Sequence, residues 1–283
     1  MQTDIFTDLA VEAAAQAPAD AAGVQSHTAV QGALRITRLE ITSQAGEAAL
    51  GRPQGRYYTA EIPDALGQGD DDYDQAAHTL AELLAELLPE GDGCLLVAGL
   101  GNEGVTPDAL GPETASRVLV TRHLTTSDAK LAELFRAVAV VCPGVLGQTG
   151  IESLALVKSA MQTAQPDVVI VIDALAAAEP GRLFRTVQLT DTGIVPGSGV
   201  GNSRQEFSQR TLGVPVVAVG VPTVMDAAGA LQPALTRDMP QGLLVTLRDV
   251  DARVREMGRL VGYGCDLALH RGLSLAEIPT FLS

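Results

Sequence analysis

An apolar run that ends in an aspartate constrains the fold of this chain more than any other feature. Five consecutive β-branched residues, Val168 to Ile172, are followed directly by Asp173. A run without polar alternation suits a strand that is buried on both faces, as in a parallel sheet between helices. A carboxylate after such a run is costly unless it is paired, hydrogen-bonded or protonated. Asp173 is therefore a candidate functional residue.

The same succession of strand, loop and helix repeats from Cys94 onward. The expected strands are Cys94–Ala98, Ala137–Cys142, Val168–Ile172, Thr186–Leu189 and Val214–Val219. The expected helices are Asp108–Arg117, Gly150–Ala164, Arg204–Thr211 and a long final one near Leu247–Arg271. This order predicts an α/β fold with a twisted, mostly parallel sheet covered by helices on both faces.

The first 90 residues follow a different pattern. Residues 13–33 are rich in Ala, Gln, Gly and Pro, and we interpret them as a weak helix or a mobile linker. Leu34–Thr42 alternates and Arg56–Ile62 is a plausible second strand, whereas the leucine spacing of Ala76–Leu88 is helical. We expect residues 9–90 to form a small N-terminal β appendage with a helix, beside an α/β body of residues 91–283, in one compact domain overall.

Charge and cysteine content narrow the function. The 34 acidic and 19 basic residues give a formal charge of −15, which argues against direct binding of nucleic-acid phosphates. The 3 cysteines lack the CxxC spacing of a zinc site or the pattern of a disulfide framework. The first residues do not have the features of a signal peptide, and no apolar run approaches the roughly 20 residues that span a bilayer. We expect a soluble cytoplasmic protein without a cofactor or a bound metal.

A second acidic residue, Asp108, follows the expected strand Cys94–Ala98. The carboxyl ends of neighbouring strands are where an open α/β sheet builds its site, so Asp108 and Asp173 are expected to meet there. Two close carboxyl groups can share a proton and perform acid/base chemistry. Thr106-Pro107 before Asp108 also suits the start of a helix, and spacing leaves capping and catalysis equally open.

Four further features have competing interpretations. Asp191-Thr-Gly193 looks like the signature of pepsin-like proteases, but it occurs once and in an α/β pattern, so we interpret it as a turn. The glycine-rich loop Pro196–Asn202 either offers backbone N–H groups to a ligand or is a plain crossover. Cys142 at a strand end is a candidate nucleophile, although a buried hydrophobic role is favoured. His123 suits a core or hydrogen-bonding role better than a metal role.

Segments from residue 7 to residue 226 together resemble the germination protease family, the spore endopeptidases that degrade small acid-soluble spore proteins. The matching stretches are Thr7–Ala13, Gly99–Asn102, Val105–Pro112, Val120–Leu124, Pro143–Glu152, Ile172–Ala176, Asp191–Asn202 and Gly220–Asp226. They occur in order, and several are too long to match by chance.

The resemblance implies a fold related to hydrogenase-maturation peptidases, a homotetramer in the cytoplasm of the spore core or forespore, and synthesis as an inactive precursor. It places the two catalytic aspartates of the family on Asp108 and Asp173. The family cleaves after an acidic residue that is followed by an apolar residue and Ala, a pattern found at Asp8-Leu9-Ala10. The resemblance therefore implies self-processing between Asp8 and Leu9, with residues 1–8 as the propeptide and small acid-soluble spore proteins as substrates.

A mechanism follows from two carboxyl groups. We expect one to be ionised and to activate water while the other, protonated, assists the scissile carbonyl. Backbone groups of Gly197, Ser198, Gly199 and Gly201 are candidate donors to the developing oxyanion or to substrate. The alternatives are a metal-dependent peptidase that uses Asp108, Asp173 and His123, a cysteine peptidase that uses Cys142, and a non-catalytic module that binds spore proteins.

Overall fold

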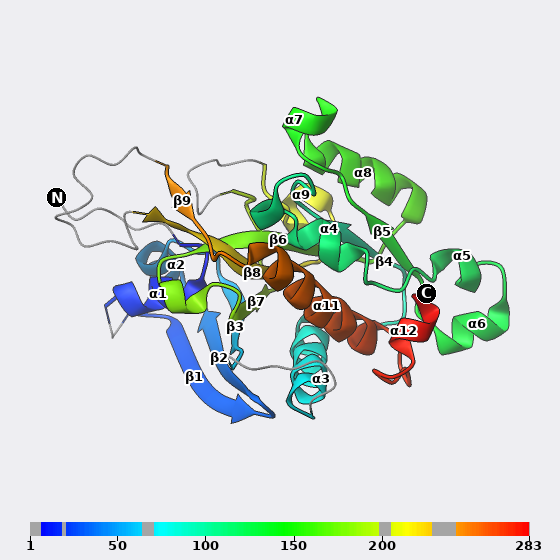
Figure 1. Cartoon of the computed structure of the whole chain (residues 1–283), viewed down its shortest axis with the longest axis horizontal. Helices are drawn as coiled ribbons and strands as arrows, with labels where there is room; N and C mark the ends of the chain where they lie inside the picture. The colour runs from blue at the N-terminus through cyan, green and yellow to red at the C-terminus, as the bar shows by residue number, and fades with distance from the viewer. Residues whose placement is uncertain (1–6, 19–20, 64–70, 198–204, 228–241, 283) are drawn as a thin grey trace.

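The computed structural model describes residues 7–18, 21–63, 71–197, 205–227 and 242–282, and these form one sheet with helices on both faces (Figure 1). The strand order is β1-β2-β3-β7-β8-β6-β4-β5, and β9 also pairs with β8. The strands are β1 Val24–Gln31, β2 Leu34–Ile41, β3 Gly55–Glu61, β4 Leu95–Gly99, β5 Val138–Val141, β6 Val168–Ala177, β7 Thr186–Thr190, β8 Val216–Asp226 and β9 Leu244–Val245. The helices are α1 Ala10–Gln16, α2 Gln44–Leu50, α3 Asp71–Leu87, α4 Leu110–Ala115, α5 Arg122–Thr125, α6 Ala129–Leu134, α7 Leu146–Thr149, α8 Ser153–Ala164, α9 Gln209–Leu212, α11 Val250–Leu269 and α12 Ile278–Phe281.

The parallel part of the sheet consists of β5, β4, β6 and β8. These strands pair in parallel in that order, and they correspond to four of the apolar runs that the sequence marks as strands. Both faces of β6 are buried along its whole apolar run, which explains the absence of polar alternation. The predicted α/β fold, with a large sheet flanked by helices, is confirmed.

The sheet is mixed, and only this end of it, from β8 to β5, is parallel. β7 pairs antiparallel with β8, β3 with β7, β2 with β3, and β1 with β2. The strands expected as an N-terminal appendage therefore extend the same sheet through the β3–β7 pair. β1 lies within residues interpreted from sequence as a helix or linker, because its side chains are mostly exposed and follow no apolar pattern.

Three apolar clusters cover the sheet. α3 and α11 lie side by side (Figure 1) and pack on one face, on the side chains of Val168, Ile170 and Ile172. On the opposite face, α8 and α9 cover Val169 and Val171. On that same face, α1 and α2 cover the β2–β3 wing. Between these two covered areas the helices leave a stretch of the face over β6, β8 and β7, where the cavities described below lie.

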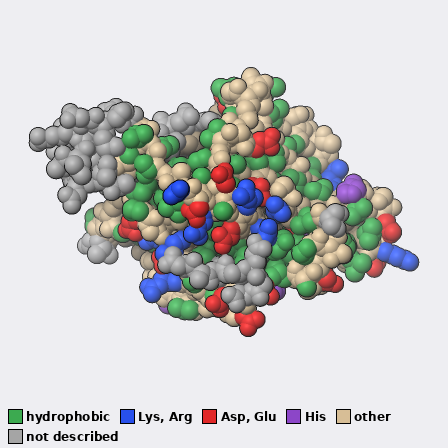
Figure 2. Space-filling view, in the orientation of Figure 1, with side chains coloured by type: hydrophobic (Ala, Val, Ile, Leu, Met, Phe, Trp, Pro, Cys, Tyr) green, Lys and Arg blue, Asp and Glu red, His purple; other side chains and the backbone are tan. Residues whose placement is uncertain are grey.

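No described helix combines the length and the apolar character needed to cross a membrane. The face shown in Figure 2 mixes acidic, basic and apolar side chains.

Asp266 makes the stability of this fold depend on pH. It is fully buried on α11, where its Oδ1 accepts the Leu119 N–H at 2.8 Å. Burial raises the pKa of its carboxyl to about 7, and the Leu119 hydrogen bond opposes this shift. A raised pKa means that the folded state binds the proton more tightly than the unfolded state. Stability is therefore lost as pH rises from about 4 to about 7.

We expect Asp266→Asn to stabilise the protein above pH 7, by at most about 4 kcal/mol, because Asn keeps an acceptor for Leu119 and cannot ionise. The gain should be small near pH 4, where the wild-type carboxyl is protonated in the folded state and about half protonated in the unfolded state. Urea unfolding of both chains at pH 4, 6 and 8 measures it. A gain that is the same at all three pH values would show that ionisation of Asp266 is not its cause.

Candidate active site

β6 extends past its neighbour β4 and carries Asp173 just beyond the last pair. The β4–β6 ladder ends at Gly99 and Ile172, and the Leu100 N–H then donates to the Ile172 carbonyl at 2.8 Å. Asp173 is the next residue of β6 and is 4% exposed. Its Oδ1 accepts the Ala174 N–H at 2.9 Å, so the strand itself orients this buried carboxyl group.

Asp108 ends the 3-10 helix Thr106–Asp108, which folds back against the same strand ends. The Asn102 N–H donates to the Asp108 carbonyl at 3.1 Å. Gly101 has φ +112°, and a Cβ there would lie 2.0 Å from that carbonyl oxygen. A Cβ on Gly111 in α4 would lie 2.6 Å from the Ile172 carbonyl oxygen. Glycine at these two positions therefore permits the close approach that brings Asp108 to the end of β6.

Thr223 of β8 attaches the 3-10 helix to the sheet through a hydrogen bond. Its hydroxyl donates to the Pro107 carbonyl at 2.7 Å, and its side chain is fully buried. The residue that precedes Asp108 is thus fixed to a central strand. Thr223 was not singled out as a site residue from sequence, because nothing in an isolated Thr signals a contact with a segment 116 positions away.

One cavity of about 350 Å³ contains both aspartates and the predicted processing residue. We call it the acidic cavity, after Asp8, Asp108 and Asp173, which all line it. The rest of its lining includes Gly197, Glu152, Phe207, Thr223 and Thr246. The structure thus brings Asp108, in the 3-10 helix after β4, and Asp173, within β6, to one cavity. Ser198, Gly199 and Gly201, the other predicted loop donors, lie outside the described residues.

A second cavity, of about 650 Å³, adjoins the first and shares Asp8 and Leu175 with it. Gln188 of β7 lines it. Gly220 of β8 pairs with Asp173 on one side and with Gln188 on the other, so these three residues lie in one row across the sheet. Laterally paired residues project to the same face, which places Asp173 and Gln188 on either side of a residue without a side chain.

The N-terminal segment forms hydrogen bonds with Ala176 of β6 and with Gln188 of β7. The Asp8 N–H donates to the Ala176 carbonyl at 2.9 Å, and the Ala176 N–H donates to Asp8 Oδ2 at 2.8 Å. Gln188 Nε2 donates to the Asp8 carbonyl at 3.1 Å, and Gln188 Oε1 accepts the Ala10 N–H at 2.6 Å. The peptide bond between Asp8 and Leu9 is therefore held on both sides at the edge of the acidic cavity.

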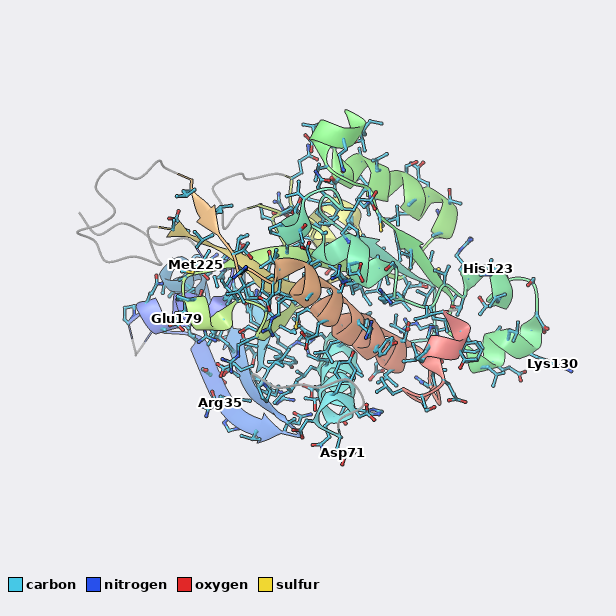
Figure 3. All side chains as sticks on the ribbon, in the orientation of Figure 1. Arg35, Asp71, His123, Lys130, Glu179 and Met225 are labelled. Atoms are coloured by element: carbon cyan, nitrogen blue, oxygen red, sulfur yellow. The ribbon has the colours of Figure 1, made fainter. Side chains whose placement is uncertain are left out.

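Glu12 anchors the helix that follows this segment. Its carboxylate is 2% exposed and accepts the N–H groups of Ala178 and Glu179 at 2.8 and 2.9 Å. It also accepts the Thr7 hydroxyl and lies 3.4 Å from Arg182 Nε. Figure 3 shows Glu179 close to α1. α1 is thus attached to the chain just past β6, the strand that carries Asp173.

Other predicted site residues lie elsewhere. His123 is exposed on α5, far from the N-terminal segment in Figure 3. Cys142 is exposed after β5 rather than buried as expected, and partial burial of its sulfur together with the charge of Glu103 raises the pKa of the thiol. Neither His123 nor Cys142 is among the described residues that line the acidic cavity. The described part of the chain also brings together no three His, Cys, Asp or Glu side chains in a cluster suited to a metal ion.

Asp191 makes a structural contact and is one of the residues that line the second cavity. It accepts the Arg56 backbone N–H at 2.8 Å and the Arg56 Nε–H at 2.7 Å. The Asp191-Thr192-Gly193 triplet thus bonds to β3 after the end of β7 and does not line the acidic cavity.

Comparison with known proteins finds relatives along most of the chain. The chain is 36% identical to the germination protease of Clostridium tetani over 99% of both chains. It is 45% identical to that of Oceanobacillus iheyensis over 69% of this chain and 54% of the relative. Among solved structures, the [NiFe] hydrogenase maturation protease HycI from Thermococcus kodakarensis KOD1 matches 64% of this chain and 97% of its own, at 15% identity and a TM-score of 0.37.

A family model also matches most of the sequence. The model described as Germination protease matches residues 4–236. This range includes Gln188 and three residues that line the acidic cavity, Asp8, Asp108 and Asp173. The chain belongs to the germination protease family.

Proposed function

We propose that this protease of spore germination is an aspartate-dependent endopeptidase that removes its own residues 1–8 and then degrades small acid-soluble spore proteins. One observation carries the proposal: Asp8, Asp108 and Asp173 line the same cavity. Two carboxyl groups in a cavity that is also lined by a residue of the chain's own N-terminal segment are an arrangement suited to intramolecular hydrolysis.

The chemistry uses the two carboxyl groups in complementary states. The ionised group takes a proton from a water molecule, whose oxygen attacks the Asp8 carbonyl carbon. The protonated group assists the carbonyl, the carbon–nitrogen bond to Leu9 breaks, and the Leu9 nitrogen takes up a proton. We assign neither state to an individual residue, because interacting carboxyl groups titrate as a pair.

The proposal concerning substrate rests on family membership and on the match between Asp8-Leu9-Ala10 and the expected cleavage pattern. A substrate cut at the same pattern presents the same three residues to the cavity. Small acid-soluble spore proteins are the substrate class that the resemblance implies, and their cleavage in trans is proposed to follow the loss of residues 1–8.

Intact-mass spectrometry of the purified full-length chain tests the proposal. We expect loss of residues 1–8 at mildly acidic pH, with a first-order rate constant that does not depend on protein concentration, because Asp8 lies in the cavity of its own chain. A rate constant proportional to concentration would indicate cleavage between copies. If no residues are lost between pH 5 and pH 7.5, and a chain that starts at Leu9 leaves a purified small acid-soluble spore protein intact, the proposal is wrong.

A further inference from the structure

We infer that Gln188 is a catalytic residue of self-processing, which grips the scissile peptide on both sides and donates a hydrogen bond to the carbonyl oxygen under attack. This inference rests on the proposed function, because it requires cleavage between Asp8 and Leu9. Gln188 is a polar residue of a central strand, and it is only 7% exposed. Burial of an amide is costly unless its donor and acceptor are both used.

The Gln188 amide forms one hydrogen bond with the carbonyl of the scissile peptide and one with the N–H of the peptide group that follows it. Nε2 donates to the carbonyl of Asp8, and Oε1 accepts the N–H of Ala10, two residues further on. Only oxygen can accept from the Ala10 N–H, so this contact fixes which end of the amide faces the Asp8 carbonyl. The side chain therefore pairs with the N-terminal segment much as a neighbouring strand would, across the bond expected to break.

The position of the donor suits stabilisation of an oxyanion. The Asp8 carbonyl oxygen gains negative charge when water attacks its carbon, and a donor already in place at 3.1 Å can strengthen its bond at that moment. Gly220 lies between Asp173 and Gln188 in the row across the sheet. Two strand spacings, about 10 Å in all, separate the backbones of Asp173 and Gln188. The Leu175 side chain covers Gly220 in this row, since a Cβ there would lie 2.5 Å from Leu175 Cγ, and Leu175 lines both cavities together with Asp8.

The end of β6 binds the acidic side chain that precedes this bond. Ala176 exchanges two hydrogen bonds with Asp8: its carbonyl accepts from the Asp8 N–H, and its N–H donates to the Asp8 carboxylate. An ionised acceptor makes a stronger bond to a backbone N–H than a neutral one. An acidic residue before the scissile bond is thus recognised by backbone, while Gln188 holds the bond itself.

Substitution of Gln188 tests the assignment in the self-processing reaction. We expect Gln188→Ala to lower the first-order rate constant by about 10² to 10³-fold, the usual effect of losing one oxyanion donor. Gln188→Glu keeps the shape and an acceptor for Ala10, but its ionised carboxyl cannot donate. It should be about as slow as Gln188→Ala near pH 7. It should then gain about tenfold on Gln188→Ala as acid protonates the new carboxyl.

Thr186→Val is the matched control. Thr186 lies on the same strand and face as Gln188, is 1% exposed, and is not among the described residues that line either cavity. It should process within about twofold of the wild type, with all chains compared after urea unfolding has shown that they are folded. Wild-type rates in both Gln188 variants would overturn the assignment and leave the proposed peptidase standing. Absence of processing in every chain, wild type included, would instead overturn the proposed function and the assignment with it.

Discussion

Asn in place of either Asp108 or Asp173 is expected to abolish self-processing, with a fall in rate constant of at least about 10³-fold. Asn can neither take a proton from water nor give one to the carbonyl, so each substitution removes one half of the acid/base pair. Loss of either half stops the reaction, since the two groups act on the same peptide bond. Intact-mass spectrometry over several days at mildly acidic pH measures the residual rate.

Asp167→Asn is the control for these variants. Asp167 immediately precedes β6, at the opposite end of the strand from Asp173, and is exposed. The same chemical change there should leave the rate within about twofold of the wild type. Normal processing in one of the cavity variants would remove that aspartate from the mechanism. Normal processing in both would favour a mechanism in which neither carboxyl group takes part.

The fold was predictable where burial leaves a pattern in the sequence. The apolar runs that became β4, β5, β6 and β8 were all expected, since each is covered by helices on both faces. β1 was not, because an exposed edge strand that pairs only with β2 needs no apolar residues. The direction of β7 and its pairing with β3 could not be predicted either, because a run of apolar residues carries no information about strand direction.

The site was predictable for the same reason and to the same extent. Asp173 stands out because a carboxylate after a buried run is costly, and Asp108 because it follows the neighbouring strand. Gln188 did not stand out. Thr186 and Thr190, which lie on the same face of β7, are also polar, so the alternation in this strand looks like that of a half-exposed strand. All three side chains are buried, and Gln188 acquires its significance from contacts with residues 178 and 180 positions earlier in the chain.

Glu12→Gln is expected to destabilise the protein by about 3 kcal/mol, the largest loss that we predict for a single substitution. The carboxylate of Glu12 is buried and accepts two backbone N–H groups, one from Ala178 and one from Glu179. The amide of Gln has one oxygen, so its NH₂ group would face one of these donors and leave it unsatisfied. Arg182, which is 18% exposed, would also lose its most buried counter-ion. Urea unfolding at pH 7 measures the loss.

Glu179→Gln is the matched control, because the Glu179 carboxylate lies 3.2 Å from the same Arg182 Nε but is 62% exposed. An exposed pair contributes little, so its loss should change stability by less than about 0.5 kcal/mol. Equal effects of the two substitutions would show that the ion pair with Arg182, and not the buried bonds to backbone, determines the role of Glu12.

The same substitution should slow self-processing. Glu12 attaches α1 to Ala178 and Glu179. These two residues follow closely after Ala176, which pairs with Asp8. Loss of that anchor lets the start of α1 shift relative to β6, and a displacement of about 1 Å at a reacting bond can cost about 10²-fold in rate. Processing at the wild-type rate in a destabilised Glu12→Gln chain would mean that Ala176 and Gln188 position the scissile bond without help from α1. The position of the bond and the stability of the N-terminal segment would then be separate properties of the chain.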